Sequence, residues 1–157
     1  GGSESLGFEL AVDFGLTDSL NAYVAYSYND ATYLGTGDTT VDGANGIVPG
    51  NRVAGIPENM FVAALDWASG SWNAGVSAKY TGDREVNQSN TWTADAFTIT
   101  DLYAGVSLDD FGNFLDDLHL DLVVNNLFDE EYLGTIASNA AWIGGPRTYA
   151  LTLTADF

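Results

Sequence analysis

The side chains that could carry chemistry are one histidine–aspartate pair, one acidic segment and three arginines. His119 is the only histidine, and Asp121 follows it by two residues. Because side chains alternate faces along a strand, the two would share a face, as the base and the orienting acid of a hydrolase do. We identify no serine placed as their nucleophile. We therefore interpret them as polar side chains facing a wet interior and expect no catalytic residues.

The segment DDFGNFLDD (109–117) contains four acids and could suggest a calcium site. It lacks the twelve-residue loop spacing, in which a glycine and a terminal glutamate take fixed positions. We interpret it as a solvated turn. The chain has no cysteine, which excludes a disulfide framework and a thiolate metal site. We expect neither a metal nor a cofactor.

Arg52, Arg84 and Arg147 lie in or beside long polar segments, and such cations would suit an anionic ligand. We predict Arg52 and Arg84 as candidate ligand contacts. The alternative is a salt bridge to neighbouring acids or to phosphates at the cell surface. Four loop aromatics are candidates for the same binding mouth, with packing near the surface as their alternative: Trp92, Trp142, Tyr33 and Tyr132.

The composition excludes several classes of protein. The 157 residues include 22 acids and 4 bases, a formal net charge of −18, so no basic patch for nucleic acid can be built. The 20 aromatic residues (4 Trp, 8 Tyr, 8 Phe) argue against disorder. The sequence contains no run of about 18 apolar residues, so no membrane helix is predicted. The opening GGSESLG does not resemble a signal peptide, and we interpret it as the remnant of a loop or a cloning scar.

The elements that position these side chains are predicted to be strands, because apolar and polar residues alternate strictly along the chain. At the end of the chain, Tyr149, Leu151, Leu153, Ala155 and Phe157 share one parity, which predicts a strand with one apolar side. Six earlier segments show the same pattern, and none has a helical period. The seven predicted strands lie within residues 7–15, 19–30, 61–67, 71–80, 100–108, 118–125 and 148–157.

The connections between these strands alternate in length. Residues 15–18, 68–70 and 109–117 are short, whereas residues 30–56, 82–95 and 128–146 are long and polar. Short turns on one side and long loops on the other are typical of an outer-membrane β-barrel. Aromatic residues are expected in two interfacial girdles: Phe14, Trp67, Trp72, Phe111, Phe114 and Phe157 at the turns, and Tyr26, Tyr28 and Tyr80 at the loops.

A soluble antiparallel barrel or sandwich is the alternative, and its apolar face would point inward. Acids recur on the face opposite the apolar one, which favours a wet lumen: Glu9, Asp13, Asp66, Asp101, Asp121 and Asp156. Seven is an odd number, and an antiparallel meander closes on itself only with an even one. Either a strand within 128–146 or 30–56 is missed, or the chain is part of a larger barrel, which we favour.

Several motifs resemble those of the TonB-dependent outer-membrane receptors. NNLFDEEY (125–132) and GGPRTYALTLTADF (144–157) resemble the family's last two strands, and GFEL (7–10), SYNDATY (27–33) and NRVAGIPENMF (51–61) resemble weaker signatures before them. YLGTIASNAAWIGGPRT (132–148) is most similar to a ferric-siderophore receptor subgroup. The Pro-Arg of the last loop is a family feature, so Arg147 is expected to be structural.

The resemblance implies that residues 1–157 are the C-terminal part, the last seven strands, of a barrel of about 22 strands. A plug domain carrying the TonB box would belong to the same receptor but is absent here. The implied protein is a multi-pass transporter, not an enzyme, in the Gram-negative outer membrane. It would take up a scarce nutrient, most often a ferric siderophore, with energy supplied through TonB.

The implied partners are outer-membrane lipid, lipopolysaccharide, the remaining barrel strands, the plug, TonB and the barrel-assembly machinery. In such barrels the last strand is an assembly signal, a role that the resemblance gives to Tyr149, Leu151, Leu153 and Phe157. Strand addition to an open sheet edge would be its physical basis. A small standalone barrel acting as an adhesin or structural protein is the alternative, and a barrel enzyme is a third.

Overall fold

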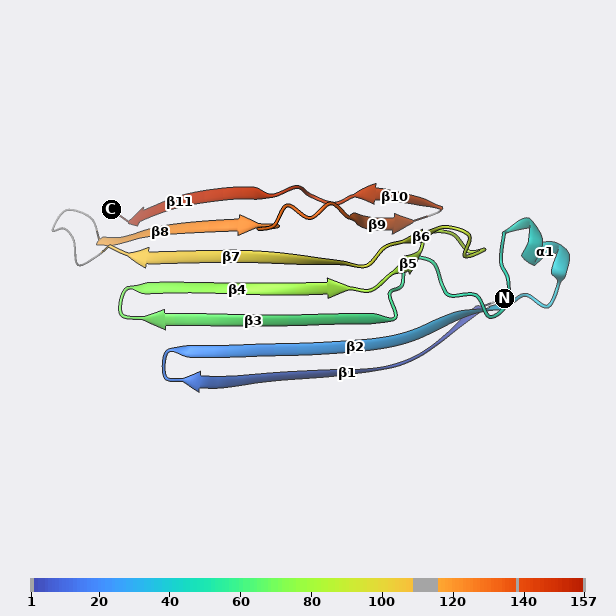
Figure 1. The fold of residues 1–157 in the computed structure, drawn as a ribbon, viewed down its shortest axis with the longest axis horizontal. Coiled ribbons are helices and arrows are strands. Elements are labelled where there is room, and N and C mark those ends of the chain that lie inside the picture. Colours follow the sequence, from blue (N-terminus) through green and yellow to red (C-terminus); the bar gives the residue numbers. More distant parts are fainter. Residues whose placement is uncertain (1, 109–115, 138, 157) are drawn as a thin grey trace.

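A computed structural model describes residues 2–108, 116–137 and 139–156 of the chain. Seven strands form one antiparallel sheet in chain order (Figure 1). They are β1 (Gly2–Thr17), β2 (Leu20–Gly35), β3 (Asn59–Ser69), β4 (Trp72–Thr81), β7 (Phe97–Ser107), β8 (Asp116–Asn125) and β11 (Thr148–Asp156). This meander confirms the predicted all-β architecture of seven strands.

The short turns and the long loops lie at opposite ends of the sheet (Figure 1). Two long loops contain small hairpins: β5 (Arg84–Glu85) with β6 (Thr93–Ala94), and β9 (Leu133–Ala137) with β10 (Ala140–Ile143). Each hairpin is a separate two-stranded sheet. The additional strands within 128–146 therefore do not alter the odd number of strands in the main sheet.

Two parts of the chain differ from the sequence-based expectation. Strand β1 begins at Gly2, and residues 2–7 pair with the end of β2, so the interpretation of GGSESLG as a loop remnant or cloning scar is wrong. The loop after β2 contains a short helix, α1 (Thr39–Ala44), capped by Asp38, whose carboxylate accepts a 2.9 Å hydrogen bond from Thr40 N. Six residues are too few to show a helical period. Among the described residues, no helix is long and apolar enough to cross a membrane.

The register joins the apolar sides of all seven strands into one continuous face. Each of the six strand pairings sets apolar residues opposite one another, so the pattern continues from edge to edge. Examples across successive pairings are Val12↔Val24, Ala22↔Leu65, Leu65↔Val76, Val76↔Leu102, Leu102↔Val124 and Leu122↔Leu151. A one-residue slip in any pairing would break this face.

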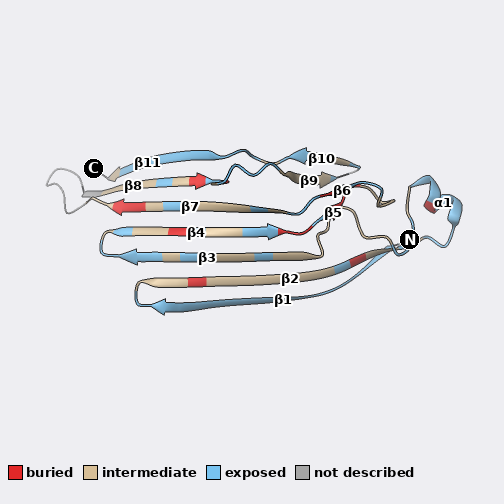
Figure 2. Ribbon diagram, in the orientation of Figure 1, coloured by how far each residue is buried: buried red, intermediate tan, exposed pale blue. Residues whose placement is uncertain are grey.

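The apolar face is exposed, as expected if lipid covers it. Leu10 on β1 is 61% exposed and Leu151 on β11 is 70% exposed, and Figure 2 shows both edge strands largely in the colour of exposed residues. Strands β3, β4, β7 and β8 have 10 or 11 residues, and a strand needs about 9–11 to cross a bilayer. This length agrees with the membrane interpretation, in which the apolar face meets lipid.

The opposite face is polar and hydrogen-bonded, which agrees with a wet lumen. The Tyr103 hydroxyl donates a 2.6 Å bond to Asp66 Oδ1, from two strands away. Asn21 Nδ2 donates to Asp13 Oδ1 at 2.9 Å. Four of the six recurrent acids, Asp13, Asp66, Asp101 and Asp121, thus have polar partners among the described residues.

The aromatic residues of the apolar face gather toward its two ends. Trp67 and Trp72 lie beside the β3–β4 turn, whereas the Phe8 ring lies 5.7 Å from that of Tyr26 on the loop side. These positions agree with the two predicted girdles. Phe111, Phe114 and Phe157 lie outside the described residues.

Gly75 accommodates an aromatic ring that crosses the backbone of the polar face. It lies opposite Tyr103 in the β4–β7 pairing. A Cβ on Gly75 would lie 2.6 Å from Tyr103 Cζ and 2.7 Å from Asp66 Oδ1. We expect Gly75→Ala to lower the free energy of unfolding by about 1–3 kcal/mol, because the ring and its hydrogen bond must move. Denaturant titration of the refolded receptor in lipid vesicles measures this change.

Gly15→Ala is the matched control, because the nearest heavy atom to a Cβ there is Thr17 O at 3.9 Å. Its free energy of unfolding should stay close to that of the parent. In a Tyr103→Ala background the Gly75→Ala substitution should lose most of its effect, because the overlapping ring is gone. An equal loss of stability in both backgrounds would contradict the steric explanation.

Candidate ligand-binding site

Arg52 ties two of the long loops together at the loop end of the sheet. Its guanidinium lies 2.7 Å from Asp83 Oδ2, 3.2 Å from Glu58 Oε1 and 3.9 Å from Glu85 Oε1. Burial acts to lower the pKa of Arg52, but the bond to Asp83 and the three carboxylate charges raise the pKa overall. Arg52 therefore remains charged, and its cation holds carboxylates of both loops together.

Backbone hydrogen bonds complete this connection. Asn90 Oδ1 accepts from Arg52 N at 2.8 Å, and Asn90 Nδ2 donates to Arg52 O at 3.0 Å. Gly55 N donates to Glu85 O at 2.8 Å, and Val86 beside it is fully buried. The loop that carries Arg84 is therefore well anchored.

Arg84 reaches from this anchored loop to the hairpin formed by β9 and β10. The residue is buried, at 6% exposed. Its Nη1 donates to Gly134 O at 3.1 Å, and its Nη2 donates to Leu133 O. The guanidinium carbon also lies 5.4 Å from the centre of the Phe97 ring. Burial lowers the pKa of Arg84, whose hydrogen-bond partners here are neutral carbonyls.

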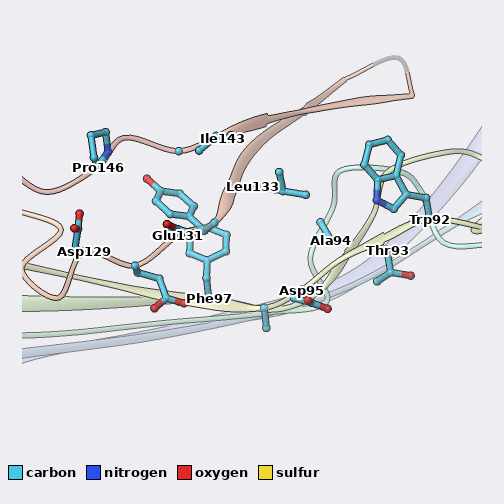
Figure 3. Close-up of a pocket in the computed structure, with 14 residues that line it drawn as sticks. Trp92, Thr93, Ala94, Asp95, Phe97, Asp129, Glu131, Leu133, Ile143 and Pro146 are labelled. Atoms are coloured by element: carbon cyan, nitrogen blue, oxygen red, sulfur yellow. The ribbon is translucent and has the colours of Figure 1, made fainter.

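A cavity of about 800 Å³ lies between the second and third long loops. We call it the loop cavity; Figure 3 shows its lining, with Trp92 at one end and Pro146 at the other. Aromatic and apolar residues in its wall are Trp92, Phe97, Tyr132, Leu133, Ile143 and Pro146. A concave wall of this kind is the usual form of a small-molecule site.

A second cavity, of about 610 Å³, lies against the polar face of the sheet. We call it the sheet cavity; Met60, Lys79, Thr81, Ile99 and Asp101 contribute its strand residues, and Arg84 lines it from the loop. Four residues line both cavities and therefore separate them: Phe97, Tyr132, Ile143 and Gly144. The rings of Phe97 and Tyr132 stack with their centres 4.3 Å apart.

The charges of the two cavities differ. Four acids line the loop cavity, Asp95, Asp129, Glu130 and Glu131, and no cation is among its described lining residues. Arg147 lies just beyond this wall, and its backbone N donates to Asp129 Oδ1 at 2.9 Å. The sheet cavity instead contains Lys79 and Arg84.

The structure distributes the four predicted ligand residues among different places. Trp92 lines the loop cavity and Arg84 lines the sheet cavity, whereas Arg52 and Trp142 line neither of the two. Contact of these residues with a ligand stays a prediction. Sequence reasoning did not select Phe97, which lies at the start of β7. Tyr132, one of the loop aromatics named from the sequence, lines both cavities. Arg147, expected to be structural, does donate to Leu127 O at 3.2 Å.

The other chemical candidates do not assemble a site. His119 Nε2 lies 3.0 Å from Asp121 Oδ1, so the nitrogen that a hydrolase needs for its nucleophile is already engaged. Most of the acidic segment 109–117 lies outside the described residues. Among the residues that are described, no cluster of three potential metal ligands occurs.

The predicted assembly-signal residues lie on the edge strand β11. Tyr149, Leu151 and Leu153 all belong to the apolar face and are 63–70% exposed. Phe157 lies outside the described residues. Within the part of the chain that the structure describes, β11 pairs with β8 on one side and with no strand on the other.

Comparison with known families gives a match over most of the chain. A family model described as TonB dependent receptor-like, beta-barrel matches residues 1–127. The match covers six of the seven strands of the main sheet.

Two curated proteins and one solved structure illustrate the similarity. The ferrichrome outer membrane transporter/phage receptor of Escherichia coli K12 is 29% identical over 96% of this chain and 20% of its own length. The ferrioxamine B receptor of Salmonella typhimurium is 30% identical over 92% of this chain and 20% of its own. The crystal structure of the siderophore receptor PiuA from Acinetobacter baumannii superposes with a TM-score of 0.76, over 96% of this chain and 21% of that one. The sequences are 23% identical, so this similarity is one of fold. The chain spans about a fifth of the length of the curated relatives it matches.

Proposed function

The chain belongs to the TonB-dependent receptor β-barrel family, and we propose that it forms part of an outer-membrane transporter for a ferric siderophore. The observation that carries this proposal is the continuous apolar face, because it allows the sheet to stand in lipid with its polar face toward a lumen. The loop cavity at one end of the same sheet would meet the ligand first. Relatives named for ferrichrome and ferrioxamine B support an iron chelate as the substrate. Transport, not catalysis, is the activity we infer.

We propose further that residues 1–157 are the C-terminal part of a larger barrel. The unpaired edges of β1 and β11 would join the remaining strands, and a plug domain would fill the lumen and engage TonB. Lipopolysaccharide would surround the loop end. The barrel-assembly machinery would bind β11, with Tyr149, Leu151, Leu153 and Phe157 as its signal.

The wall of the loop cavity favours a neutral or cationic chelate over an anionic one. Four carboxylates and no cation line it, so a negatively charged complex would meet repulsion. The three loop arginines already have partners: Arg52 bonds Asp83, Arg84 bonds main-chain carbonyls, and Arg147 bonds the Leu127 carbonyl. Ferrichrome, which is neutral, and ferrioxamine B, which is cationic, are the matching probes, and ferric citrate is the anionic one.

Uptake of radioactive iron by cells that express the receptor, in a strain without its own siderophore receptors, tests the proposal. We expect uptake from ferrichrome or ferrioxamine B that stops when TonB is deleted, and little uptake from ferric citrate. Trp92→Ala should raise the half-saturating concentration by about tenfold, as loss of an aromatic contact does. Phe128→Ala is the matched control, because this 74% exposed aromatic lies outside both cavity linings. Uptake that persists without TonB would refute the function.

A further inference from the structure

The β9–β10 hairpin is a single hydrogen-bonded unit. We call it the flap and define it as β9, β10 and the flanking residues Tyr132 and Gly144. Four cross-strand pairs join the two strands. Gly144 N donates to Tyr132 O at 2.8 Å and closes the base of the flap. A Cβ on Gly144 would overlap the Tyr132 ring, so the glycine allows the ring to lie across it.

A buried amide, that of Asn126, links both sides of the flap to the sheet, and Leu127 N adds a 2.7 Å hydrogen bond to Thr100 O on β7. Asn126 is 3% exposed, and its backbone N donates to Asp101 Oδ1 on β7 at 2.8 Å. Its side chain Nδ2 donates to Glu130 O at 2.9 Å and to Gly145 O at 3.1 Å, on the two sides of the flap. Because Gly144 and Gly145 follow β10 directly, the backbone there is permissive. This arrangement is that of a hinge.

Beyond the hinge, few interactions keep the flap in place. None of the described residues of β9 and β10 is buried, and Ile143 is 82% exposed. Gly55 lies against Ile136, and Tyr132 stacks on Phe97. The polar contacts that hold the flap, among the residues that the structure describes, are those of Arg84 with Leu133 O and Gly134 O. A segment with so little buried apolar surface opens at low free energy unless it is latched.

Arg84 has the properties of such a latch. Its backbone belongs to the loop anchored by Arg52, Asn90 and Glu85, whereas its guanidinium binds the flap and lies over Phe97. Among the described residues, its buried Nε has no hydrogen-bond partner. An arginine buried against neutral carbonyls is costly to maintain, which suggests a use beyond simple packing.

We propose that β9 and β10 form a hinged flap that closes the passage between the loop cavity and the sheet cavity, with Arg84 as the residue that positions it. Phe97 and Tyr132 are the partition, since both rings line both cavities. Release of Arg84 lets the flap turn about Asn126 and separates the two rings. That this opening serves a chelate on its way inward rests on the proposed function, whereas the flap and its latch do not.

Thiol labelling of the sheet cavity tests the latch without any ligand. The chain has no cysteine, so Thr81→Cys introduces a single thiol into this part of the receptor, at a buried position that lines the sheet cavity. A membrane-impermeant maleimide is added to whole cells that express the full receptor, otherwise free of cysteine. We expect Arg84→Met to raise the labelling rate by about tenfold or more, because two charge-assisted hydrogen bonds are lost. Arg84→Lys keeps the positive charge but loses the paired N–H donors of the guanidinium. Its labelling rate should lie between those of the parent and of Arg84→Met.

Two controls separate the latch from general loosening. Arg147→Met removes another loop guanidinium, one that donates to Leu127 O and lies 3.8 Å from Asp129 Oδ2. It should leave the labelling rate of the Thr81→Cys thiol within about twofold, as expected for a partly exposed pair. Thr39→Cys on α1 is exposed and should label at the same rate in every background. An unchanged rate for the Thr81→Cys thiol in folded Arg84→Met receptor would overturn the proposal.

Tyr132→Ala keeps the experiment decisive if Arg84→Met does not reach the membrane folded. It removes half of the partition and leaves Arg84 in place, so labelling of the Thr81→Cys thiol should again accelerate. No acceleration in folded Tyr132→Ala receptor would also overturn the proposal. Because these rates need neither iron nor TonB, a failure of the uptake experiment leaves them interpretable.

Discussion

Leu151→Arg is expected to lower the free energy of unfolding in a bilayer by about 2–4 kcal/mol if the site lies near the midplane. Leu151 is 70% exposed on the apolar face and lies opposite Leu122. A guanidinium at this position would have to leave water for hydrocarbon. Val76→Arg should behave in the same way, because Val76 lies between Leu65 and Leu102 on the same face. Equilibrium unfolding of the refolded receptor in lipid vesicles gives the free energy.

Thr152→Arg is the matched control, one residue along the same strand. Thr152 belongs to the polar face and lies opposite Asp121, so the new cation would find water and a carboxylate. Its free energy of unfolding should change clearly less than that of Leu151→Arg, unless the arginine meets the plug. The reverse order would mean that the apolar face points inward, and it would restore the soluble-barrel interpretation.

Residues 1–157 in isolation are expected neither to form a closed barrel nor to transport iron. Strands β1 and β11 are the two edges of the sheet, and with seven antiparallel strands they run in the same direction. Each edge presents a row of unpaired N–H and C=O groups. Each such group costs several kcal/mol in hydrocarbon, where no water can satisfy it. The isolated chain should therefore aggregate or pair with another chain.

Refolding the 157 residues in detergent tests this expectation. Analytical ultracentrifugation should show polydisperse or higher-order species, and electrophoresis should show no heat-modifiable monomer. The matched control is the full receptor treated identically, which should give a monodisperse, heat-modifiable species. A stable monomeric pore from residues 1–157 alone would contradict the larger-barrel proposal and favour the small standalone barrel.

The sequence alone determined the strands, their faces and the two ends of the sheet. Alternation has a period of two and is a local property, so Leu151 and Thr152 are assigned to opposite faces without any knowledge of their neighbours. Short turns favour antiparallel pairing of the strands they join, and the structure shows the register that keeps the apolar face continuous. The same local rule missed residues 2–6 of β1, where Gly2, Ser3, Glu4 and Ser5 show no alternation of apolar and polar side chains.

Only the tertiary structure decided what the loop residues do. Arg84 looks from the sequence like a free cation in a polar loop, yet it binds carbonyls 49 and 50 residues away. Phe97 and Tyr132 become neighbours only because the loop before β7 and the loop after β8 return to the same end of the sheet. Such contacts depend on the path of the whole chain and leave no periodic pattern in the sequence. The burial of the Arg84 guanidinium has the same cause.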